Sequence, residues 1–412
     1  MGTEQTTELT VLAPEDFDRW WDGVVRAFGG SASAEERELD RSLTEFERSL
    51  AARDGDEIVG TAGAFSFRMT VPGGAVVPAA GVTMVSVAGT HRRRGLLTSM
   101  MRRQLDDVRA LGEPLAVLMA SEPAIYGRFG YGAATFQLDA EIDTSRVRLT
   151  LPAGTEDVRV RYAKPADVLA ECEAVYAALV PARPGMLARR PGWERFGLLD
   201  PESERDGGSE LQCVVAERAG RITGFARFRT KMGWGPSGHD GTVTLEDLAA
   251  LDPATDGALW RFLFGMDLMS TLRVRHRPVD DAWQYVVDDI RRCRPRQRDG
   301  GHVRLVEVGK ALSARTYQAP LDVVFDVEDA FCPWNAGRWR LSGDPKGATC
   351  ERTTDAADLT LSVRELGAAY LGGVPLLSLA AAGRVRELRP GALAKAAVAF
   401  GSPLAPWLPH GF

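Results

Sequence analysis

Cysteine and histidine are scarce in this sequence, with five of each among 412 residues. The cysteines form neither a CxxC pair nor a cluster with histidine, so their spacing predicts no zinc site and no disulfide framework. We expect buried thiols in a reducing compartment, and therefore predict a cytoplasmic protein without a bound metal. The five are Cys172, Cys213, Cys293, Cys332 and Cys350.

Long apolar runs are also missing. No stretch of eighteen or more apolar residues occurs, so neither a transmembrane helix nor a membrane partner is expected. The polar, acidic N-terminus predicts no signal peptide. A hydrophobic content of 45%, a charged content of 26% and a formal net charge of -6 are typical of a soluble globular protein. The negative balance argues against nucleic acid as the main partner, despite local arginine clusters.

The chain is long enough for two or three domains, and its pattern predicts three blocks of secondary structure. The first block extends to about residue 145, and a strand–helix–strand crossover within it predicts two parallel neighbouring strands. Gly29 and Gly30 are expected to end the first helix, and VPGG to join two strands as a hairpin. Helices are predicted over 16–30, 34–51 and 96–111, and strands over 57–70, 75–89 and 115–120.

The second block, from about residue 158, repeats this order of elements without visible sequence repetition. It has no counterpart of the HRRRGLL segment at 91–97, so its own cofactor site is expected to be lost. Its predicted strands are 158–163, 211–230 and 242–251, and its predicted helices are 166–180 and 255–274.

The third block follows a basic linker at 291–301, and its proline-rich apolar tail, 401–412, is not expected to be helical. Short antiparallel strands are predicted over 337–342, 348–353 and 358–363, and helices over 367–373, 376–383 and 391–400.

Three arginines and a glycine stand between the predicted strand 75–89 and the predicted helix 96–111. The first turn of a helix offers unpaired N–H groups and the positive end of the helix dipole, and both suit a diphosphate. Gly95 would let the backbone approach such a ligand closely. A plain run of charge is more often a solvated face. The apolar strand before it and the apolar-striped helix after it favour the diphosphate site.

This turn, Arg92-x-x-Gly95-x-Leu97, resembles the cofactor motif of the Gcn5-related N-acetyltransferases (GNAT), Arg/Gln-x-x-Gly-x-Gly/Ala, with leucine replacing the last small residue. HRRRGLL together with SEPAIYGRFGYG resembles more specifically the enhanced intracellular survival (Eis) acetyltransferases, and DGALWRFLFGMD and LGAAYLGG are similar to further segments of that family. The resemblance implies a mixed α/β (α+β) protein: two tandem GNAT-like folds, then a sterol-carrier-protein-like domain. We expect these domains at 1–150, 151–296 and 297–412.

The same resemblance implies acetyl-CoA as co-substrate. The end of the predicted strand would contact the pantetheine arm, the arginine turn would hold the diphosphate, and two residues after the next strand would line the other side. The residues so implied are Val85, Ser86, Val87, Arg93, Arg94, Gly95, Leu96, Leu97, Thr98, Ser121 and Glu122. Trp21 and Asp22 are candidates for contacts with a cationic substrate, although such a helix more often packs its tryptophans.

Two residues are implied for the chemistry. Tyr126 would be the general acid that protonates the departing thiolate, because a phenol of pKa ~10 is protonated at neutral pH. On spacing alone it could equally be a packing residue of its loop. The carboxylate at Phe412, where the sequence ends, would be the general base. An α-carboxylate of pKa ~3.3–3.7 is a weak base unless it is desolvated, so a water relay or His410 stays an alternative.

The implied activity is direct N-acetylation of primary amines, with aminoglycosides acetylated at more than one amine as the leading case. A polycationic substrate suits a net-acidic protein. A polyamine or a protein lysine stays an alternative substrate, and an acyl-CoA or lipid binding protein without turnover is the alternative of a different class. The resemblance also implies a homohexamer, a trimer of dimers, and a third domain that serves mainly to deliver the C-terminal tail.

Overall fold

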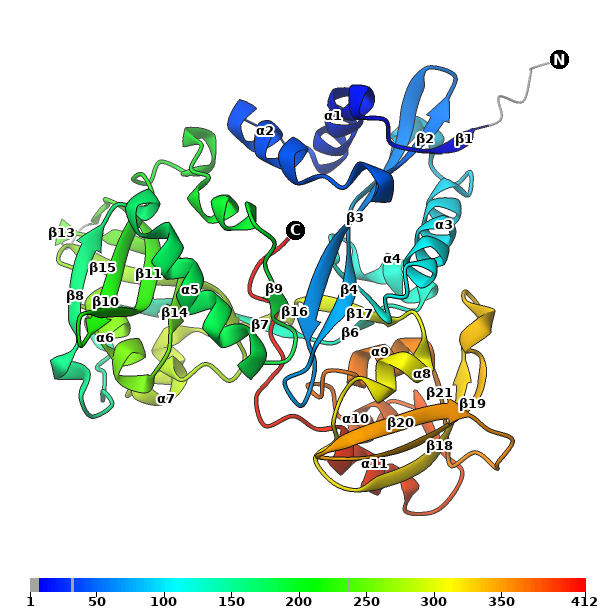
Figure 1. Cartoon of the computed structure of the whole chain (residues 1–412). Helices are drawn as coiled ribbons and strands as arrows, with labels where there is room; N and C mark the ends of the chain where they lie inside the picture. Colours follow the sequence, from blue (N-terminus) through cyan, green and yellow to red (C-terminus); the bar gives the residue numbers. More distant parts are fainter. Residues whose placement is uncertain (1–6, 31–32, 236–237) are drawn as a thin grey trace. The chain divides into compact units, whose positions relative to one another are not determined.

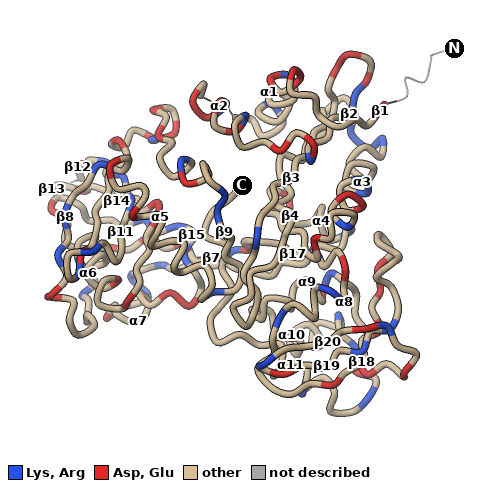
Figure 2. Tube along the Cα trace, in the orientation of Figure 1, with Lys and Arg blue, Asp and Glu red and all other residues tan. Residues whose placement is uncertain are grey.

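The computed structural model describes residues 7–30, 33–235 and 238–412. The chain divides into two compact units, Met1–Thr135 with Gly300–Phe412, and Phe136–Asp299 (Figure 1). Each unit is a mixed α/β structure, which confirms the predicted fold class. Within the described ranges, no helix combines the length and the apolar run that crossing a bilayer requires. Basic and acidic residues are interspersed along both units (Figure 2).

The first sheet has the strand order β1-β2-β3-β4-β5-β17-β6. All neighbours along this path are antiparallel except β4 and β5, which run parallel and are joined by helix α3 (Leu96–Ala110). The predicted hairpin and crossover are thereby confirmed. The strands are β1 (Glu8–Val11), β2 (Leu50–Asp54), β3 (Glu57–Thr70), β4 (Val76–Val87), β5 (Leu115–Met119), β6 (Gly132–Ala133) and β17 (Gly301–Leu305).

The helices of this part pack their apolar stripes on the sheet. On α3, the helical spacing predicts one apolar stripe of Leu97, Met101, Leu105 and Val108; the last three are fully buried and Leu97 is partly buried. Helix α1 (Phe17–Phe28) ends at Gly29, whose φ of 68° lies in the left-handed region that glycine favours.

The second predicted helix, 34–51, is wrong in its second half. Helix α2 (Ala34–Leu43) stops before the extended Thr44, and residues 50–54 form β2. The reason is local turn chemistry, because Gly55, with φ of 61°, and Asp56 form the two-residue turn of the β2–β3 hairpin, in which Asp54 pairs with Glu57. That hairpin gives residues 50–54 a strand partner.

Two strands pair outside the domains in which the sequence interpretation placed them. Strand β7 (Phe136–Asp143) lies in the sheet of the second unit, whereas β17 lies in the first sheet between β5 and β6. The predicted limits at 150 and 296 therefore differ from those of the compact units, 135/136 and 299/300. Alternating side chains show that a strand buries one face, but they do not show which neighbour it pairs with.

The sheet of the second unit has the order β16-β7-β15-β14-β11-β10-β8. Its core contains the fully buried Trp260 and Trp283. Its other strands are β8 (Arg159–Ala163), β10 (Gln212–Arg218), β11 (Arg221–Lys231), β14 (Gly241–Ala250), β15 (Met269–Pro278) and β16 (Arg296–Asp299), and its helices are α5 (Leu169–Leu179), α6 (Pro253–Phe264) and α7 (Trp283–Val286).

The predicted helix 255–274 is correct only as far as Phe264. Gly265 ends α6, and Met269–Pro278 forms β15, parallel to β14. Leu272 and Val274 stand two positions apart in this segment and are both buried, as residues on one face of a strand are. The polar turn Ala219–Gly220 joins β10 and β11 with positive φ at both residues, 48° and 75°.

The third sheet, in the first unit, has the order β20-β19-β18-β21-β22. The predicted strand at 358–363 is present as β21, which pairs antiparallel with β22 as predicted but parallel with β18; β18 and β22 themselves were not predicted. The strands are β18 (Leu321–Glu328), β19 (Gly337–Asp344), β20 (Gly347–Arg352), β21 (Leu359–Ser362) and β22 (Val385–Glu387), and the helices are α8 (Val308–Ser313), α9 (Val363–Ala369), α10 (Leu376–Ala381) and α11 (Ala392–Phe400).

A buried arginine holds two of these helices. The guanidinium of Arg315 donates to the carbonyl oxygens of Tyr370 and Phe400, which lie at the C-terminal ends of α9 and α11. It also lies 4.9 Å from the centre of the Phe400 ring. Burial lowers the pKa of Arg315, while the negative ends of the two helix dipoles and the aromatic ring favour its charge.

A second buried arginine joins the first sheet to the segment after β18. Arg304 on β17 pairs with Asp329 at 2.6 Å, with side chains 0% and 1% exposed. Asp329 also accepts hydrogen bonds from the Cys332 backbone and the Asn335 amide. Both carboxylate oxygens are therefore occupied, as a charge in a dry environment requires.

Removing one partner of this pair should destabilise the protein. We expect Arg304→Met and Asp329→Asn each to lower the free energy of unfolding by about 3–5 kcal/mol, because the remaining polar group stays buried. Urea unfolding followed by circular dichroism measures the effect. The control is Arg340→Gln, which breaks the exposed pair of Arg340 with Asp322. The urea midpoint of this variant should hardly change. Equal shifts in the two cases would contradict the argument.

Candidate active site

Strands β4 and β5 pair over only part of their length. Their ladder covers Ala79–Gly81 of β4, and no pairing with β5 follows beyond Gly81. The last residues of β4, up to Val87, keep their partners on β3 but have none on the β5 side. Backbone groups on that side are free to bind a ligand.

A β-bulge lies in this free part of β4. Thr83 pairs with Gly63 and Ser86 pairs with Thr61, so Met84 and Val85 together stand opposite a single residue. Met84 has a φ of 52°. The Thr61 hydroxyl donates to the Met84 carbonyl at 2.7 Å and lies 2.7 Å from the Ser86 hydroxyl, which must then donate to Thr61. The bulge is thus held by a buried side chain.

The arginine turn has the backbone that an anion site needs. Arg93 and Gly95 have positive φ, 64° and 83°, and Gly95 is the N-cap of α3. No side chain caps this helix, so the N–H groups of its first turn are available. A Cβ at Gly95 would meet nothing within 4 Å, so the left-handed conformation, rather than close approach, is what favours glycine here.

These features line one cavity of about 550 Å³. Its lining contains every residue predicted to bind cofactor except Arg94. Sequence reasoning missed several others that also line it: Ala27, Phe28, His91, Arg92, Ile125 and Arg128. Arg92 and Arg128 fall inside the two recognised motifs and could have been found there. Nothing in the sequence shows that the end of α1, with Ala27 and Phe28, reaches the cavity.

The cavity is electropositive at the helix end. Arg92, Arg93 and Arg128 line it, and among the described residues none of the three has an ion-pair partner. Glu122 is the one acidic residue of the lining. His91 is already engaged, because its ring nitrogens lie 2.9 Å from Asp54 and 2.8 Å from the Thr90 hydroxyl. Unpaired guanidinium groups beside an uncapped helix start suit a polyanionic ligand.

Tyr126 closes the other side of the cavity. It is the last residue of the short helix α4 (Pro123–Tyr126) and is 8% exposed. Its ring packs edge-on against Tyr131, with centroids 6.1 Å apart. Burial, and next the nearby Glu122 carboxylate, raise the pKa of Tyr126 above its ordinary value. The hydroxyl therefore stays protonated over the whole neutral range.

The C-terminal tail lies across the first sheet. Pro406 packs closely on Gly373, because a Cβ at that glycine would lie only 2.6 Å from the proline ring. The fully buried Leu408 packs in the same way over Gly301. The ring of Phe412 packs over Gly81 and against Phe67, with ring centroids 5.1 Å apart. Phe412 does not line the cavity, but its main-chain oxygen accepts a hydrogen bond from Thr83 on β4 at 2.7 Å.

The predicted substrate residues lie elsewhere. Trp21 is 5% exposed and stacks on Phe17, and its indole N–H has no partner among the described residues. Asp22 pairs with Arg37 at 2.6 Å on the surface. Neither lines the cavity, and their contact with a substrate stays a prediction.

The second unit repeats the crossover but closes its helix start. Asp252 is the N-cap of α6, and its carboxylate accepts hydrogen bonds from the Ala254 and Thr255 backbones, each at 3.0 Å. Burial opposes its ionisation, but hydrogen bonds from Thr255 and the nearby Arg218 hold the pKa of Asp252 below its ordinary value. A negative side chain thus takes the position that an anion would need. This gives a physical reason for the expected loss of the second cofactor site.

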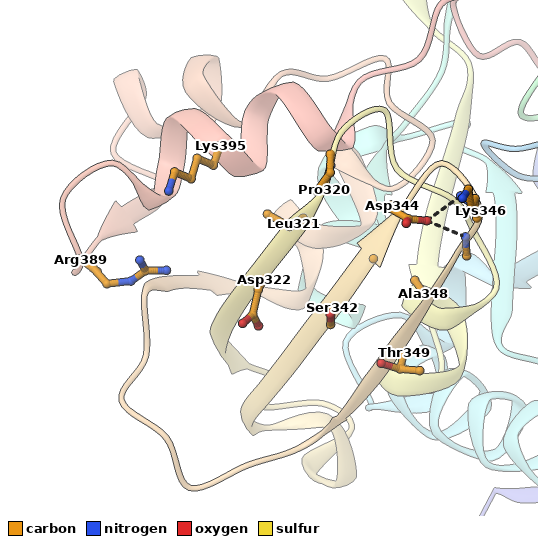
Figure 3. A pocket seen from close by; sticks show the side chains of 12 residues that line it. Pro320, Leu321, Asp322, Ser342, Asp344, Lys346, Ala348, Thr349, Arg389 and Lys395 are labelled. Carbon is orange, nitrogen blue, oxygen red and sulfur yellow. Dashed lines mark hydrogen bonds between the residues drawn. The ribbon is translucent and has the colours of Figure 1, made fainter.

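The third sheet carries a hollow of about 930 Å³ (Figure 3). Its lining is mostly polar, with Asp344 accepting two backbone hydrogen bonds from Lys346 and Gly347. Asp322 pairs with Arg340 beside it. A pocket for a lipid chain is instead enclosed and apolar. The hollow differs from such a pocket in its chemistry.

Weakening the arginine turn should weaken binding of coenzyme A. We expect Arg93→Gln to lower the affinity for acetyl-CoA roughly 10-fold, because a charge-assisted contact with phosphate is lost. Isothermal titration calorimetry measures this. Arg103→Gln on helix α3 removes a charge that faces Asp107 and solvent, so it should leave the affinity unchanged. Equal affinities for both variants would argue against a diphosphate at this turn.

Comparisons with known proteins agree with this architecture. Residues 8–134 and 185–305 match acetyltransferase (GNAT) domain families, and residues 308–409 match a sterol carrier protein domain family. An uncharacterized N-acetyltransferase of Streptomyces coelicolor is 74% identical, over 99% of this chain and 100% of its own. The N-acetyltransferase Eis of Mycobacterium tuberculosis is 31% identical, over 92% of this chain and 93% of its own.

Solved structures give the same result. The crystal structure of Eis1 from Mycobacterium abscessus is 31% identical with a TM-score of 0.84, and it matches 99% of this chain and 100% of its own. A GCN5-related N-acetyltransferase from Kribbella flavida has a TM-score of 0.78 at 25% identity, over 99% of this chain and 98% of its own. The chain belongs to the Eis family of GNAT N-acetyltransferases, with two acetyltransferase folds followed by a sterol-carrier-protein-like domain.

Proposed function

We propose that this acetyltransferase acetylates primary amines of a polycationic small molecule by direct transfer, with aminoglycosides modified at more than one amine as the leading substrates. The observation that carries the proposal is the cavity itself. An uncapped helix start with unpaired arginines, the free end of β4 and a buried tyrosine hydroxyl all line it. These groups fit the diphosphate, the amide-bearing arm and the thiol end of acetyl-CoA.

Each part of the cavity has a proposed role in holding the co-substrate. Arg93 and the N–H groups from Gly95 to Thr98 bind the diphosphate, with Arg92 and Arg128 adding positive potential. The backbone of Val85 to Val87 binds the pantetheine amides beyond the end of the β4–β5 ladder. Ser121 and Glu122 form the opposite wall. Arg94, which does not line the cavity, contributes charge from outside it.

Tyr126 is the proposed general acid. Acetyl-CoA supplies the acetyl group as a thioester, and the carbon–sulfur bond breaks as the substrate nitrogen bonds to the carbonyl carbon. The Tyr126 hydroxyl donates its proton to the departing sulfur, so the thiol leaves neutral. The raised pKa of Tyr126 keeps this proton available at and above neutral pH.

The carboxylate at Phe412 is the proposed general base. The attacking amine must lose a proton, and the carboxylate would take it directly or through a water molecule. Support comes from the tail, whose buried Leu408 and packed Phe412 ring fix its end against β4. His410 is the weaker candidate, because its Nδ1 lies 3.0 Å from the Gly411 carbonyl and bonds it locally.

The substrate class rests on the family and on charge. A net charge of -6 attracts a polycation, and Asp22 near Trp21 is a proposed contact for one of its amines. The implied homohexamer and the cytoplasmic location stay predictions beside this proposal.

Release of free thiol from acetyl-CoA tests the substrate class. With a panel of aminoglycosides, polyamines and lysine peptides, we expect turnover with aminoglycosides, and mass spectrometry should find products with more than one acetyl group. Turnover with polyamines alone or with lysine peptides alone would contradict the aminoglycoside proposal and would indicate a polyamine or a protein lysine as the substrate. Tight binding of acetyl-CoA without thiol release from any amine would favour a binding protein.

Tyr126→Phe tests the acid. We expect kcat to fall about 100-fold or more, because a positioned proton donor contributes that much, while the affinity for acetyl-CoA stays near wild type. The matched control is Tyr131→Phe. The Tyr131 hydroxyl is buried without a partner among the described residues and does not line the cavity, so its removal should leave kcat unchanged. Unchanged turnover of Tyr126→Phe would remove Tyr126 as the acid.

A further inference from the structure

Thr83 is the one side chain that hydrogen-bonds the main-chain oxygen of Phe412 among the described residues. The Thr83 hydroxyl lies 2.7 Å from that oxygen, which is a carboxylate oxygen where the chain ends at Phe412. A hydroxyl beside a carboxylate can only donate, so the direction of this bond is fixed. Thr83 is half-buried on β4, and its β-branched side chain has few rotamers to choose from.

Thr83 also stands next to the co-substrate cavity along the strand. It is the last paired residue before the bulge at Met84 and Val85, and Val85 lines the cavity. The bulge is held from the other strand by Thr61. The position of the Phe412 oxygen is therefore coupled to the part of β4 that would hold the reacting end of acetyl-CoA.

The rest of the tail fixes where Phe412 lies but not how its carboxylate is turned. Apolar contacts hold the ring of Phe412 on Phe67 and Gly81, and hold Leu408 over Gly301. Apolar contacts are non-directional, so they leave rotation of the terminal carboxylate free. The hydrogen bond from Thr83 is the contact that sets its orientation.

We propose that Thr83 is a positioning residue, which binds one oxygen of the Phe412 carboxylate and turns the other toward the substrate amine. This inference rests on the proposed role of Phe412 as the base. Thr83 itself exchanges no proton with the substrate.

Two pairs of variants test the role of the hydroxyl. Thr83→Val keeps the shape and removes the donor, and Thr83→Ala is a second variant without the hydroxyl. For both we expect kcat to fall roughly 10- to 100-fold through lost orientation, with the affinity for acetyl-CoA within about twofold of wild type. Thr83→Ser should restore most of kcat. The control Thr244→Val, on strand β14 of the second unit, should behave as wild type.

A double-mutant cycle separates this inference from the proposed base. Two glycines added after Phe412 displace the carboxylate and should themselves lower kcat at least as far as Thr83→Val does. In that extended chain, Thr83→Val should have no further effect, because there is no longer a carboxylate to position.

Other outcomes would overturn either the proposed base or the positioning role of Thr83. An extended chain with full activity would remove Phe412 as the base, and Thr83 would lose its role with it. An extension that lowers kcat, together with a fully active Thr83→Val, would remove only the positioning role. Equal losses in the valine and serine variants would show that the hydroxyl is not what matters.

Discussion

The short ladder between β4 and β5 is the constraint on which the rest of the site depends. Two parallel strands joined by a helix would ordinarily pair along their length and leave no backbone group for a ligand. Here pairing ends at Gly81, and the bulge at Met84 keeps β4 from resuming it. The same crossover must then bring the start of α3 beside the free strand end. Helix dipole, arginine turn and unpaired backbone come together because one ladder stops early.

The tail depends on the opposite condition, which is a bare sheet surface. A chain can lie across a sheet only where there is room for it, and Gly301 leaves room for Leu408, while Gly81 leaves room for Phe67 and the Phe412 ring that packs against it. The buried pair Arg304–Asp329 ties β17, the strand that begins at Gly301, to the segment following β18. Strand β17, which directly precedes the sterol-carrier-like part, is thus paired within the first acetyltransferase sheet, and the tail that leaves the sterol-carrier-like part lies on the same sheet.

Local signals in the sequence predicted α1, α3 and the β3–β4 hairpin, because helix stops, turn residues and periodicity act over a few neighbouring positions. The resemblance to a known family supplied most, but not all, of the cavity lining. Non-local pairing was not predicted. Strand β7 joins the second sheet and β17 the first, and nothing in either strand's alternation distinguishes the two. The predicted helix 255–274 failed beyond Phe264 for the same reason, since pairing with β14 and β7 makes residues 269–278 a strand. Ala27 and Phe28 reach the cavity through tertiary packing alone.

The second unit shows that backbone geometry alone does not make a helix start an anion-binding site. It has the same strand, helix and parallel strand, yet Asp252 caps its helix start where the first fold leaves Gly95 without a side chain. A charged carboxylate there satisfies the N–H groups and repels phosphate, whereas Gly95 leaves those groups open beside unpaired arginines. The Asp252 carboxylate at the N-cap, together with the absence of an HRRRGLL counterpart, makes the second helix start unfavourable for an anion. The two units thus share a crossover but differ in the charge at the helix start, and the proposed diphosphate site depends on that charge.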